Sequence, residues 1–173
     1  MSSNLLAVAD GVGGWASQGV DPAIYSKQLC KNIDELVKQK ESYLDDPKQL
    51  LCDAVAENRH IGSSTCVLAA LDKHKPQIIT CNLGDSGYIL LRKNGLDLVK
   101  IFQSKEQQHQ FNFPFQVGTG GDDPAKGEEQ LHAVEHNDII ILASDGLWDN
   151  LFSVKIIDMV RPFLRDRDEL LDP

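Results

Sequence analysis

Four short apolar segments between residues 63 and 103 constrain the fold more than any other feature of the chain. They read SSTCVLAAL, QIITCNL, YILLRK and LDLVKIF, and the turn clusters DKHKP, GDSG and KNG separate them. Segments of this length between such clusters are typical of strands joined by tight turns. Parallel neighbours would need much longer crossover connections. The sequence therefore predicts a four-stranded antiparallel meander here.

The N-terminal third predicts one strand followed by two helices. Residues 4–9 (NLLAVA) are short, apolar and followed by glycines, which favours a buried strand. Asp21 is suited to cap a helix whose first residue is Pro22, and apolar residues then recur at helical spacing to about residue 40. Asp46 and Pro47 predict the start of a second helix in the same way.

The C-terminal third predicts an irregular segment, two strands and a helix. Residues 103–130 are polar and rich in glycine, and a loop of that length in a compact domain is usually functional or disordered. Residues 131–144 predict two strands, and residues 153–164 predict the last helix. The order of elements favours the α+β class with antiparallel sheets. The length and the absence of repeats predict a single domain over residues 1–173.

Composition excludes several kinds of partner. The formal net charge is −9 and no basic stripe is present, which disfavours nucleic acid. No apolar run approaches the roughly 20 residues of a membrane-spanning helix. The four cysteines form no C-x-x-C pair, so four buried free thiols in a reducing compartment are favoured over a disulfide framework or a zinc site (Cys30, Cys52, Cys66 and Cys81).

Three aspartates occupy equivalent positions where apolar strands end. Asp10 follows LLAVA, Asp85 follows ITCNLG and Asp145 follows IIILAS, each with a glycine within two residues. Carboxylates next to exposed backbone carbonyls are the ligands that Mg²⁺ and Mn²⁺ prefer. Aspartate is also common in ordinary turns. From these residues alone, a shared cation site and three independent turns both stay open.

Six blocks of sequence, in this order, carry a family resemblance. They are ADGVGGW (9–15), Val20-Asp21-Pro22, GSST (62–65), NLGDSG (82–87), EQQHQFNFPFQ (106–116) and SDGLWDN (144–150). Together they cover nearly the whole chain and resemble the metal-dependent protein phosphatases of type 2C. The DGVGGW block is similar to a subgroup whose members are mostly found in mitochondria or plastids.

The resemblance implies an αββα sandwich, in which two packed antiparallel sheets lie between layers of helices, with a binuclear Mg²⁺ or Mn²⁺ site at one end. By the matching motifs, Asp10 would bridge the two ions and the carbonyl of Gly11 would bind the first. Asp145 would bind the second ion, and Asp85 matches the position of an additional, weaker ion. Asp10 and Asp145 are thus the implied catalytic residues.

The implied reaction is hydrolysis of phosphoserine or phosphothreonine in a phosphoprotein substrate, by a metal-activated water and without a phosphoenzyme intermediate. Gly118 and Gly120 would lie in or near the flap that borders the cleft. Many family members have a histidine general acid where this chain has Val12. His109 is a candidate replacement, and a histidine in a surface loop is the alternative interpretation.

The family pattern also includes a strand before the first block and a strand near the C-terminus, and this sequence contains neither. We therefore expect an αββα sandwich that lacks these terminal strands and has exposed sheet edges. Three explanations stay open: a fragment of an active phosphatase, a catalytically impaired pseudophosphatase that serves as a structural or binding subunit of a larger assembly, or a partner chain that supplies the strands. The subgroup resemblance implies the mitochondrial matrix, with the cytoplasm as the alternative.

Overall fold

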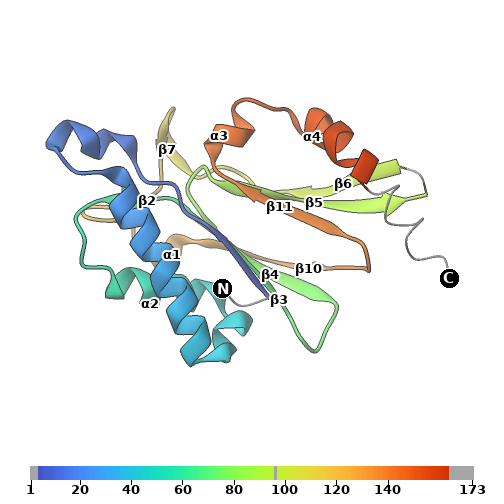
Figure 1. Cartoon of the computed structure of the whole chain (residues 1–173), viewed down its shortest axis with the longest axis horizontal. Helices are drawn as coiled ribbons and strands as arrows, with labels where there is room; N and C mark the ends of the chain where they lie inside the picture. The colour runs from blue at the N-terminus through green and yellow to red at the C-terminus, as the bar shows by residue number, and fades with distance from the viewer. Residues whose placement is uncertain (1–3, 96, 164–173) are drawn as a thin grey trace.

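The computed structural model describes residues 4–95 and 97–163, which form two stacked antiparallel sheets (Figure 1). The first sheet has the strand order β1-β3-β4-β10, and the second has the order β11-β5-β6. The strands of the first sheet are β1 Leu5–Val8, β3 Cys66–Leu71, β4 Gln77–Leu83 and β10 Glu128–Ala133. Those of the second are β11 Ile139–Ala143, β5 Gly87–Asn94 and β6 Asp97–Gln103.

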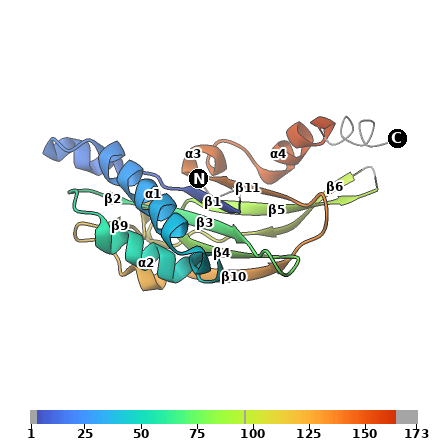
Figure 2. The same ribbon diagram turned by 60° about the horizontal axis from the view of Figure 1, so that its bottom comes forward.

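Helices cover the outer face of each sheet (Figures 1 and 2). Helices α1 (Pro22–Gln39) and α2 (Pro47–Glu57) lie on the first sheet, where α2 contacts β3, β4 and β10. Helices α3 (Asp145–Trp148) and α4 (Ser153–Val160) lie on the second, against β11 and β6 respectively. These layers confirm the predicted αββα sandwich.

The capping pattern of the first two helices is confirmed. The Asp21 side chain accepts a 2.9 Å hydrogen bond from the backbone N–H of Ala23. The Asp46 side chain accepts an equivalent bond from the N–H of Gln49. Each carboxylate satisfies one of the N–H groups that a helix leaves unpaired at its start. The last helix begins at Ser153 as predicted, but its predicted end at residue 164 lies outside the described residues.

The prediction of one four-stranded meander is wrong. Strands β3 and β4 are antiparallel neighbours, and so are β5 and β6, but β4 and β5 belong to different sheets. The hydroxyl of Thr80 in β4 donates a 2.8 Å hydrogen bond to the Tyr88 hydroxyl of β5, from one sheet to the other. A short turn can link strands of two stacked sheets as readily as neighbouring strands of one sheet. The length of the connection therefore did not distinguish these two arrangements.

The predicted irregular segment is more ordered than its composition suggested. It contains the hairpin of β7 (Gln108–Gln110) and β8 (Phe113–Pro114). It also contains β9 (Val117–Gly118), which pairs with β2 (Ser63–Ser64) next to the first sheet. Three 3₁₀ helices that the sequence did not predict complete the described elements: η1 Gly13–Gln18, η2 Glu41–Asp45 and η3 Pro124–Lys126.

Two hydrophobic clusters hold the layers together. The larger lies between the first sheet and helices α1 and α2, and it includes the fully buried Leu29, Leu50 and Leu68. The smaller lies between the second sheet and helices α3 and α4. All four cysteines are free thiols, and Cys66 and Cys81 are buried in the larger cluster as predicted. Cys30 and Cys52 are only partly buried, so the prediction of burial is wrong for these two. Among the described helices, none is long and apolar enough to cross a membrane.

Candidate functional site

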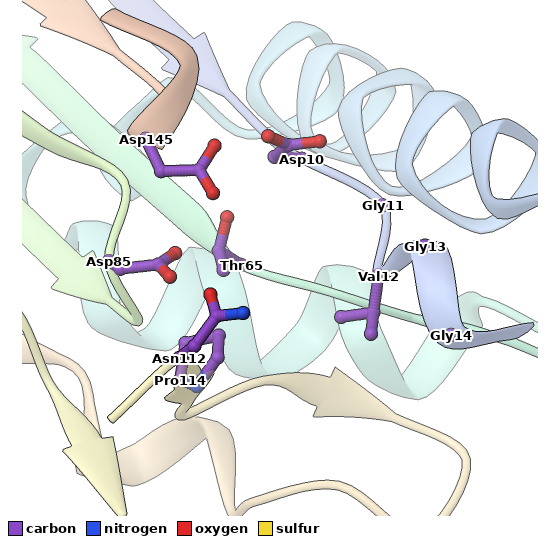
Figure 3. Close-up of a pocket in the computed structure, with 10 residues that line it drawn as sticks. All are labelled: Asp10, Gly11, Val12, Gly13, Gly14, Thr65, Asp85, Asn112, Pro114 and Asp145. Carbon is purple, nitrogen blue, oxygen red and sulfur yellow. The ribbon is translucent and has the colours of Figure 1, made fainter. Parts of the chain in front are cut away.

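A pocket of about 310 Å³ opens where the two sheets meet, and all three strand-end aspartates line it. Asp10 comes from the end of β1, Asp145 from the end of β11, and Asp85 from the turn that links the sheets. Figure 3 shows the three carboxylates arranged around the same space. The remaining lining residues are residues 11–14, Thr65, Asn112 and Pro114.

Backbone pairing with β2 and with Thr65, the residue after it, fixes Asp10 and Gly11. The Asp10 carbonyl accepts hydrogen bonds from the Thr65 N–H at 3.0 Å and from the Ser64 hydroxyl at 2.9 Å. Gly11 forms an isolated antiparallel bridge with Ser64, and the next N–H, that of Val12, donates to the Ser63 carbonyl at 3.0 Å. The chain therefore stays extended past the end of β1, which holds the Asp10 side chain at the pocket.

Gly11 is required because the start of helix α1 packs directly on it. A Cβ atom at this position would lie 2.1 Å from the carbonyl oxygen of Pro22, much closer than any van der Waals contact allows. Gly13, two residues later, has no atom within 4 Å of its equivalent position. The glycine at position 11 thus allows a close backbone approach at one corner of the pocket, rather than a left-handed turn.

A tight link between the sheets positions Asp85. Gly84 has a φ of 106°, a conformation that favours glycine, and the next residue, Asp85, is 8% exposed. The hydroxyls of Thr65 and Ser86 are hydrogen-bonded at 2.7 Å directly beneath this link. Asp85 is therefore a nearly buried carboxylate at the edge of the pocket, held on a backbone that has little freedom to move.

Asp145 is the first residue of α3, directly after β11. Its carbonyl accepts a 2.8 Å hydrogen bond from the N–H of Asp149, which closes the short helix. The Trp148 indole N–H donates at 2.9 Å to the Ala143 carbonyl at the end of the strand. These two bonds tie the helix to its strand and fix the direction in which the Asp145 side chain enters the pocket.

The pocket concentrates negative charge. The pKa of Asp10 lies above its usual value because burial, and then the nearby charge of Asp145 together with a hydrogen bond to it, disfavour ionisation. Burial, followed by the charge of Asp145, raises the pKa of Asp85 to about 6. Carboxylates that resist ionisation because they face one another are stabilised when a cation lies between them.

The donor set fits a hard divalent cation that keeps part of its water shell. Within residues 4–95 and 97–163, no cluster of three or more His, Cys, Asp or Glu side chains could hold an ion by itself. Mg²⁺ usually binds through one or two carboxylates and several waters. The pair of Asp10 and Asp145, with the adjacent backbone of Gly11 and water, meets that requirement.

Three residues that the sequence associated with the flap do not line this pocket. His109 lies in β7, and its Nε2 atom is 2.9 Å from a carboxylate oxygen of Asp122. Gly118 ends β9, with the Gly62 carbonyl 2.3 Å from where a Cβ atom would be. Gly120 has a φ of 66° in the turn that follows. A role for these three in substrate binding stays a prediction.

Thr65, Asn112 and Pro114 also line the pocket, and their roles were not predicted from the sequence. Thr65 and Pro114 lie in the GSST and FNFPFQ blocks, where nothing in the pattern separates them from their neighbours. Asn112 has a φ of 54°. Asparagine tolerates this left-handed region better than most residues, so an Asn between aromatic residues in a polar segment could have indicated a hairpin turn.

A two-sheet αββα sandwich with aspartates from both sheets at one pocket defines a class of metal-dependent phosphatase, and the comparisons with known proteins agree. The family model described as Stage II sporulation protein E (SpoIIE) matches residues 3–169. The chain belongs to this family, within the metal-dependent phosphatases of type 2C.

Named relatives support this membership. The chain is 39% identical over 157 residues to "Probable protein phosphatase 2C 55" of Arabidopsis thaliana, covering 90% of this chain and 32% of that protein. It is 34% identical over 174 residues to the human "Protein phosphatase PTC7 homolog", covering 92% of this chain and 56% of that protein. The chain thus spans between a third and about half of the length of these relatives.

Solved structures share the fold. The X-ray structure of the photosystem II phosphatase PBCP superposes with a TM-score of 0.83 at 31% identity, covering 90% of this chain and 60% of that one. The catalytic domain of PstP, a serine/threonine phosphatase, in complex with two manganese ions gives a TM-score of 0.69 at 18% identity. This alignment covers 93% of the present chain and 75% of PstP, and at that identity it supports the fold alone.

Proposed function

We propose that the chain forms the catalytic core of a protein serine/threonine phosphatase, which hydrolyses phosphoserine and phosphothreonine in protein substrates at a binuclear Mg²⁺ or Mn²⁺ site. The observation that carries the proposal is the convergence of Asp10, Asp85 and Asp145 on one pocket from two different sheets. The family membership and the relatives named as protein phosphatases support it.

In the proposed site, Asp10 and the Gly11 carbonyl hold one side of the metal centre and Asp145 holds the other. Asp85 is the proposed ligand of an additional, weaker ion. When bound, the metal centre supplies Lewis acidity, which lowers the pKa of a water molecule and neutralises charge on the phosphoryl group. The overall reaction converts a phosphate monoester and water into an alcohol and inorganic phosphate.

The leaving group needs a proton that no histidine in this pocket can supply. Among the described residues that line it, none is a histidine, and Val12 contributes an apolar side chain. His109 faces Asp122 instead. We therefore assign the leaving-group proton to water in the open pocket, and we expect activity to show no dependence on a histidine pKa.

A phosphopeptide assay with Mn²⁺ tests this proposal. We expect Asp145→Asn to lower kcat/KM at least about 100-fold, because it removes a direct carboxylate ligand. The matched control is Asp158→Asn on α4, which removes an exposed carboxylate paired with Arg161 and should leave activity unchanged.

Mn²⁺ binding followed by calorimetry gives a readout that does not depend on turnover. Wild-type and Asp158→Asn proteins should bind Mn²⁺ alike, and Asp145→Asn should bind it more weakly. Equal turnover by wild-type and Asp145→Asn proteins would contradict the phosphatase mechanism. Mn²⁺ binding without turnover would favour the alternative, a catalytically impaired pseudophosphatase that acts as a binding subunit.

We further propose that additional polypeptide covers the groove between β1 and β11. Within the described residues, each of these strands is an edge strand with one partner, and the two lie near each other. An open groove of about 370 Å³ runs between them, lined in part by Leu5, Leu6 and Ile140. Unpaired strand edges and apolar surface are what an added strand covers. Because the relatives are longer, a segment of a longer form of this chain is the favoured occupant.

Hydrogen exchange tests this second proposal. We expect slower exchange of the β1 and β11 amides when the chain is expressed with its native flanking sequence. Protection that appears without a change in molecular mass supports a segment of the same chain. Protection confined to a larger complex would instead favour a partner chain, and unchanged exchange in every preparation would contradict the proposal.

We propose the mitochondrial matrix as the location, on the basis of the subgroup resemblance of the DGVGGW block, with the cytoplasm as the alternative. Fractionation of cells that express the full-length protein with a C-terminal tag tests this. Protease-protected protein in the mitochondrial fraction supports the proposal, and protein confined to the cytosolic fraction overturns it.

A further inference from the structure

The β7–β8 hairpin borders the pocket and carries one of its lining residues at its tip. The tip is the pair Phe111 and Asn112, between Gln110 and Phe113, which pair with each other across the two strands. Asn112 has a φ of 54°, and its carboxamide is directed toward the space between the aspartates in Figure 3. Asparagine tolerates this left-handed conformation better than most residues, which suits it to the tip of a two-residue hairpin.

The base of the hairpin is fixed to the link that carries Asp85. The N–H of Gln107 donates to the Gly84 carbonyl at 2.9 Å, and the Gln107 side-chain carbonyl accepts from the Gly84 N–H at 3.2 Å. The N–H of Phe115 then donates to the Gln107 carbonyl at 2.9 Å, which closes the base. The position of the hairpin is therefore set by the same backbone that positions a pocket carboxylate.

A second set of contacts stiffens the middle of the hairpin. The His109 ring stands 4.3 Å from that of Phe115 and 5.2 Å from that of Phe113, between ring centroids. Asp122 contacts the other edge of His109 and also pairs with Lys126 at 2.9 Å. Through these contacts, His109 supports the hairpin. The tip is the part of the hairpin that is free to contact a ligand.

The tip combines an exposed aromatic ring with a hydrogen-bond donor in the pocket. Phe111 is 96% exposed, the highest value among the exposed large hydrophobic residues, and it packs on none of the three supporting rings. Among the described residues that line the pocket, Asn112 alone has a side chain with N–H groups. The other polar side chains there are three carboxylates and the Thr65 hydroxyl, which is already bonded to Ser86.

We propose that this hairpin is a substrate-binding arm that selects phosphopeptides with an apolar residue beside the phosphorylated serine or threonine. Asn112 donates from Nδ2 to a phosphoryl oxygen in the pocket, and Phe111 packs on the neighbouring apolar side chain of the substrate. The inference rests on the proposed phosphatase function and adds a substrate class to it. It accounts both for an amide side chain that lines an acidic pocket and for an aromatic ring left in water next to that pocket.

Three substrates distinguish the contribution of Phe111 to binding from that of Asn112. They are p-nitrophenyl phosphate, a phosphoserine peptide with leucine beside the phosphoserine, and the same peptide with glycine in place of leucine. We expect Phe111→Ala to lower kcat/KM about tenfold for the leucine peptide, mainly through KM, and to leave the other two substrates unchanged. The matched control is Phe152→Ala, which removes a ring that is 88% exposed at the start of α4.

For the second part, Asn112→Gly removes the carboxamide and keeps a residue that adopts a positive φ without strain. We expect kcat/KM to fall about 10- to 100-fold for all three substrates, because a hydrogen bond to a charged group is lost. The melting temperature should stay within about 2 °C of wild type, as expected for exposed tip residues. A loss of activity that tracks a loss of stability would overturn the binding role of Asn112.

The arm and the phosphatase function fail in different ways. If Phe111→Ala lowers kcat/KM equally for the leucine and glycine peptides, the proposal of a binding arm is overturned. Turnover by the wild-type protein would still support the phosphatase function. If the wild-type protein hydrolyses none of the substrates, the proposed function fails, and fluorescence anisotropy of the two labelled phosphopeptides still tests the arm. Tighter binding of the leucine peptide than of the glycine peptide by wild type, with this difference lost in Phe111→Ala, supports the binding arm. Equal dissociation constants of wild type and Phe111→Ala for the leucine peptide overturn it.

Discussion

Each of the two helix-covered sheets supplies an aspartate to the pocket, but their edge strands and helices are packed differently. In the first layer, strand β3 is buried along nearly its whole length, and helices α1 and α2 contribute side chains with no exposure. In the second layer, the central strand β5 is also buried over residues 87–91, but no residue of the edge strand β11 is fully buried, and Ile156 is the buried residue of α4. Helix α4 and its flanks instead expose apolar side chains: Phe152, Val154, Met159 and Phe163.

The difference bears on the site because Asp10 follows β1, whose Leu5 is buried in the larger cluster, whereas Asp145 follows β11, in which no residue is fully buried. Stability is rarely uniform across a fold, and regions with few buried apolar contacts open first. The half of the metal site that contains Asp145 should therefore depend more on bound ligand and on added polypeptide than the half that contains Asp10.

The largest expected effect comes from truncating a strand residue in the first layer. Leu68→Ala in β3 removes a fully buried side chain and should cost about 2–5 kcal/mol of unfolding free energy. Leu142→Ala, the matched change in β11, removes a half-buried side chain and should cost about 1–2 kcal/mol. Urea denaturation of both variants measures the contrast, and equal losses would show that the layers are equally packed.

Gly11→Ala should be the next most damaging change. It should lower the free energy of unfolding by about 2–3 kcal/mol, because overpacking forces α1 away from the end of β1. The added Cβ atom would lie 2.1 Å from the Pro22 carbonyl oxygen. Gly13→Ala is the matched control, since nothing lies within 4 Å of its Cβ position. Thermal denaturation separates the two variants. A stable Gly11→Ala protein would mean that the strand end can move, and the Asp10 corner would then be less rigid than its packing indicates.

How far the fold could be predicted depended on whether its determinants are local. The Asp21 and Asp46 caps act within one helical turn, so the sequence predicted both helix starts correctly. The layer change at Gly84 depends on the partners of β4 and β5, which are β10 and β11, more than 40 residues away. Nothing in a four-residue turn encodes those partners, and the meander prediction failed at this point.

The site divides in the same way. Asp10, Asp85 and Asp145 could be found in the sequence because each lies two residues after the end of an apolar strand and has a glycine within two residues. Asn112 reaches the pocket from a hairpin tip whose position is set by Gln107 and Gly84. That placement depends on contacts between segments far apart in the chain, so the residue type and its neighbours could not indicate it.

Asp138→Asn should lower the free energy of unfolding by a smaller amount, about 1.5–2 kcal/mol. It weakens the hydrogen bonds between Arg92 and Asp138, which form a clamp in the second layer. The Asp138 carboxylate accepts two hydrogen bonds from the Arg92 guanidinium of β5, at 2.7 and 2.9 Å, and one from the Glu135 N–H. Glu135→Gln, which changes an exposed partner of the same arginine, is the control and should cost less than about 0.5 kcal/mol.

The effect of Asp138→Asn should also depend on pH. Burial by itself raises the pKa of Asp138, but the bonds from Arg92 and Glu135 and the charge of Arg92 outweigh burial and hold it below its usual value. A lowered carboxylate pKa contributes stability above the unfolded-state pKa, and that contribution is lost as pH falls through the folded-state pKa. The difference between wild type and Asp138→Asn should be constant above about pH 5 and shrink below about pH 4. A difference that grows on acidification would contradict the clamp.

The smallest effect concerns Asp85, on the link between the two layers. Because burial, and then the charge of Asp145, raise its pKa to about 6, the native metal-free protein binds a proton more tightly there than the unfolded chain does. The free energy of unfolding of the metal-free wild-type protein should therefore fall as pH rises from about 4 to 6. Asp85→Asn cannot ionise, so in the presence of EDTA at pH 7.5 it should be more stable than wild type by about 1 kcal/mol, once screening at the open pocket is included.

Adding Mn²⁺ should reverse that order for the same physical reason. A cation in the pocket stabilises the ionised carboxylate, so the wild-type protein should gain more from Mn²⁺ than Asp85→Asn does. Thermal shifts measured with EDTA and with Mn²⁺ at pH 7.5 and pH 5 provide the comparison. If Asp85→Asn gains as much as wild type, then Asp85 takes no part in cation binding, and the metal site is confined to Asp10 and Asp145, one carboxylate from each layer.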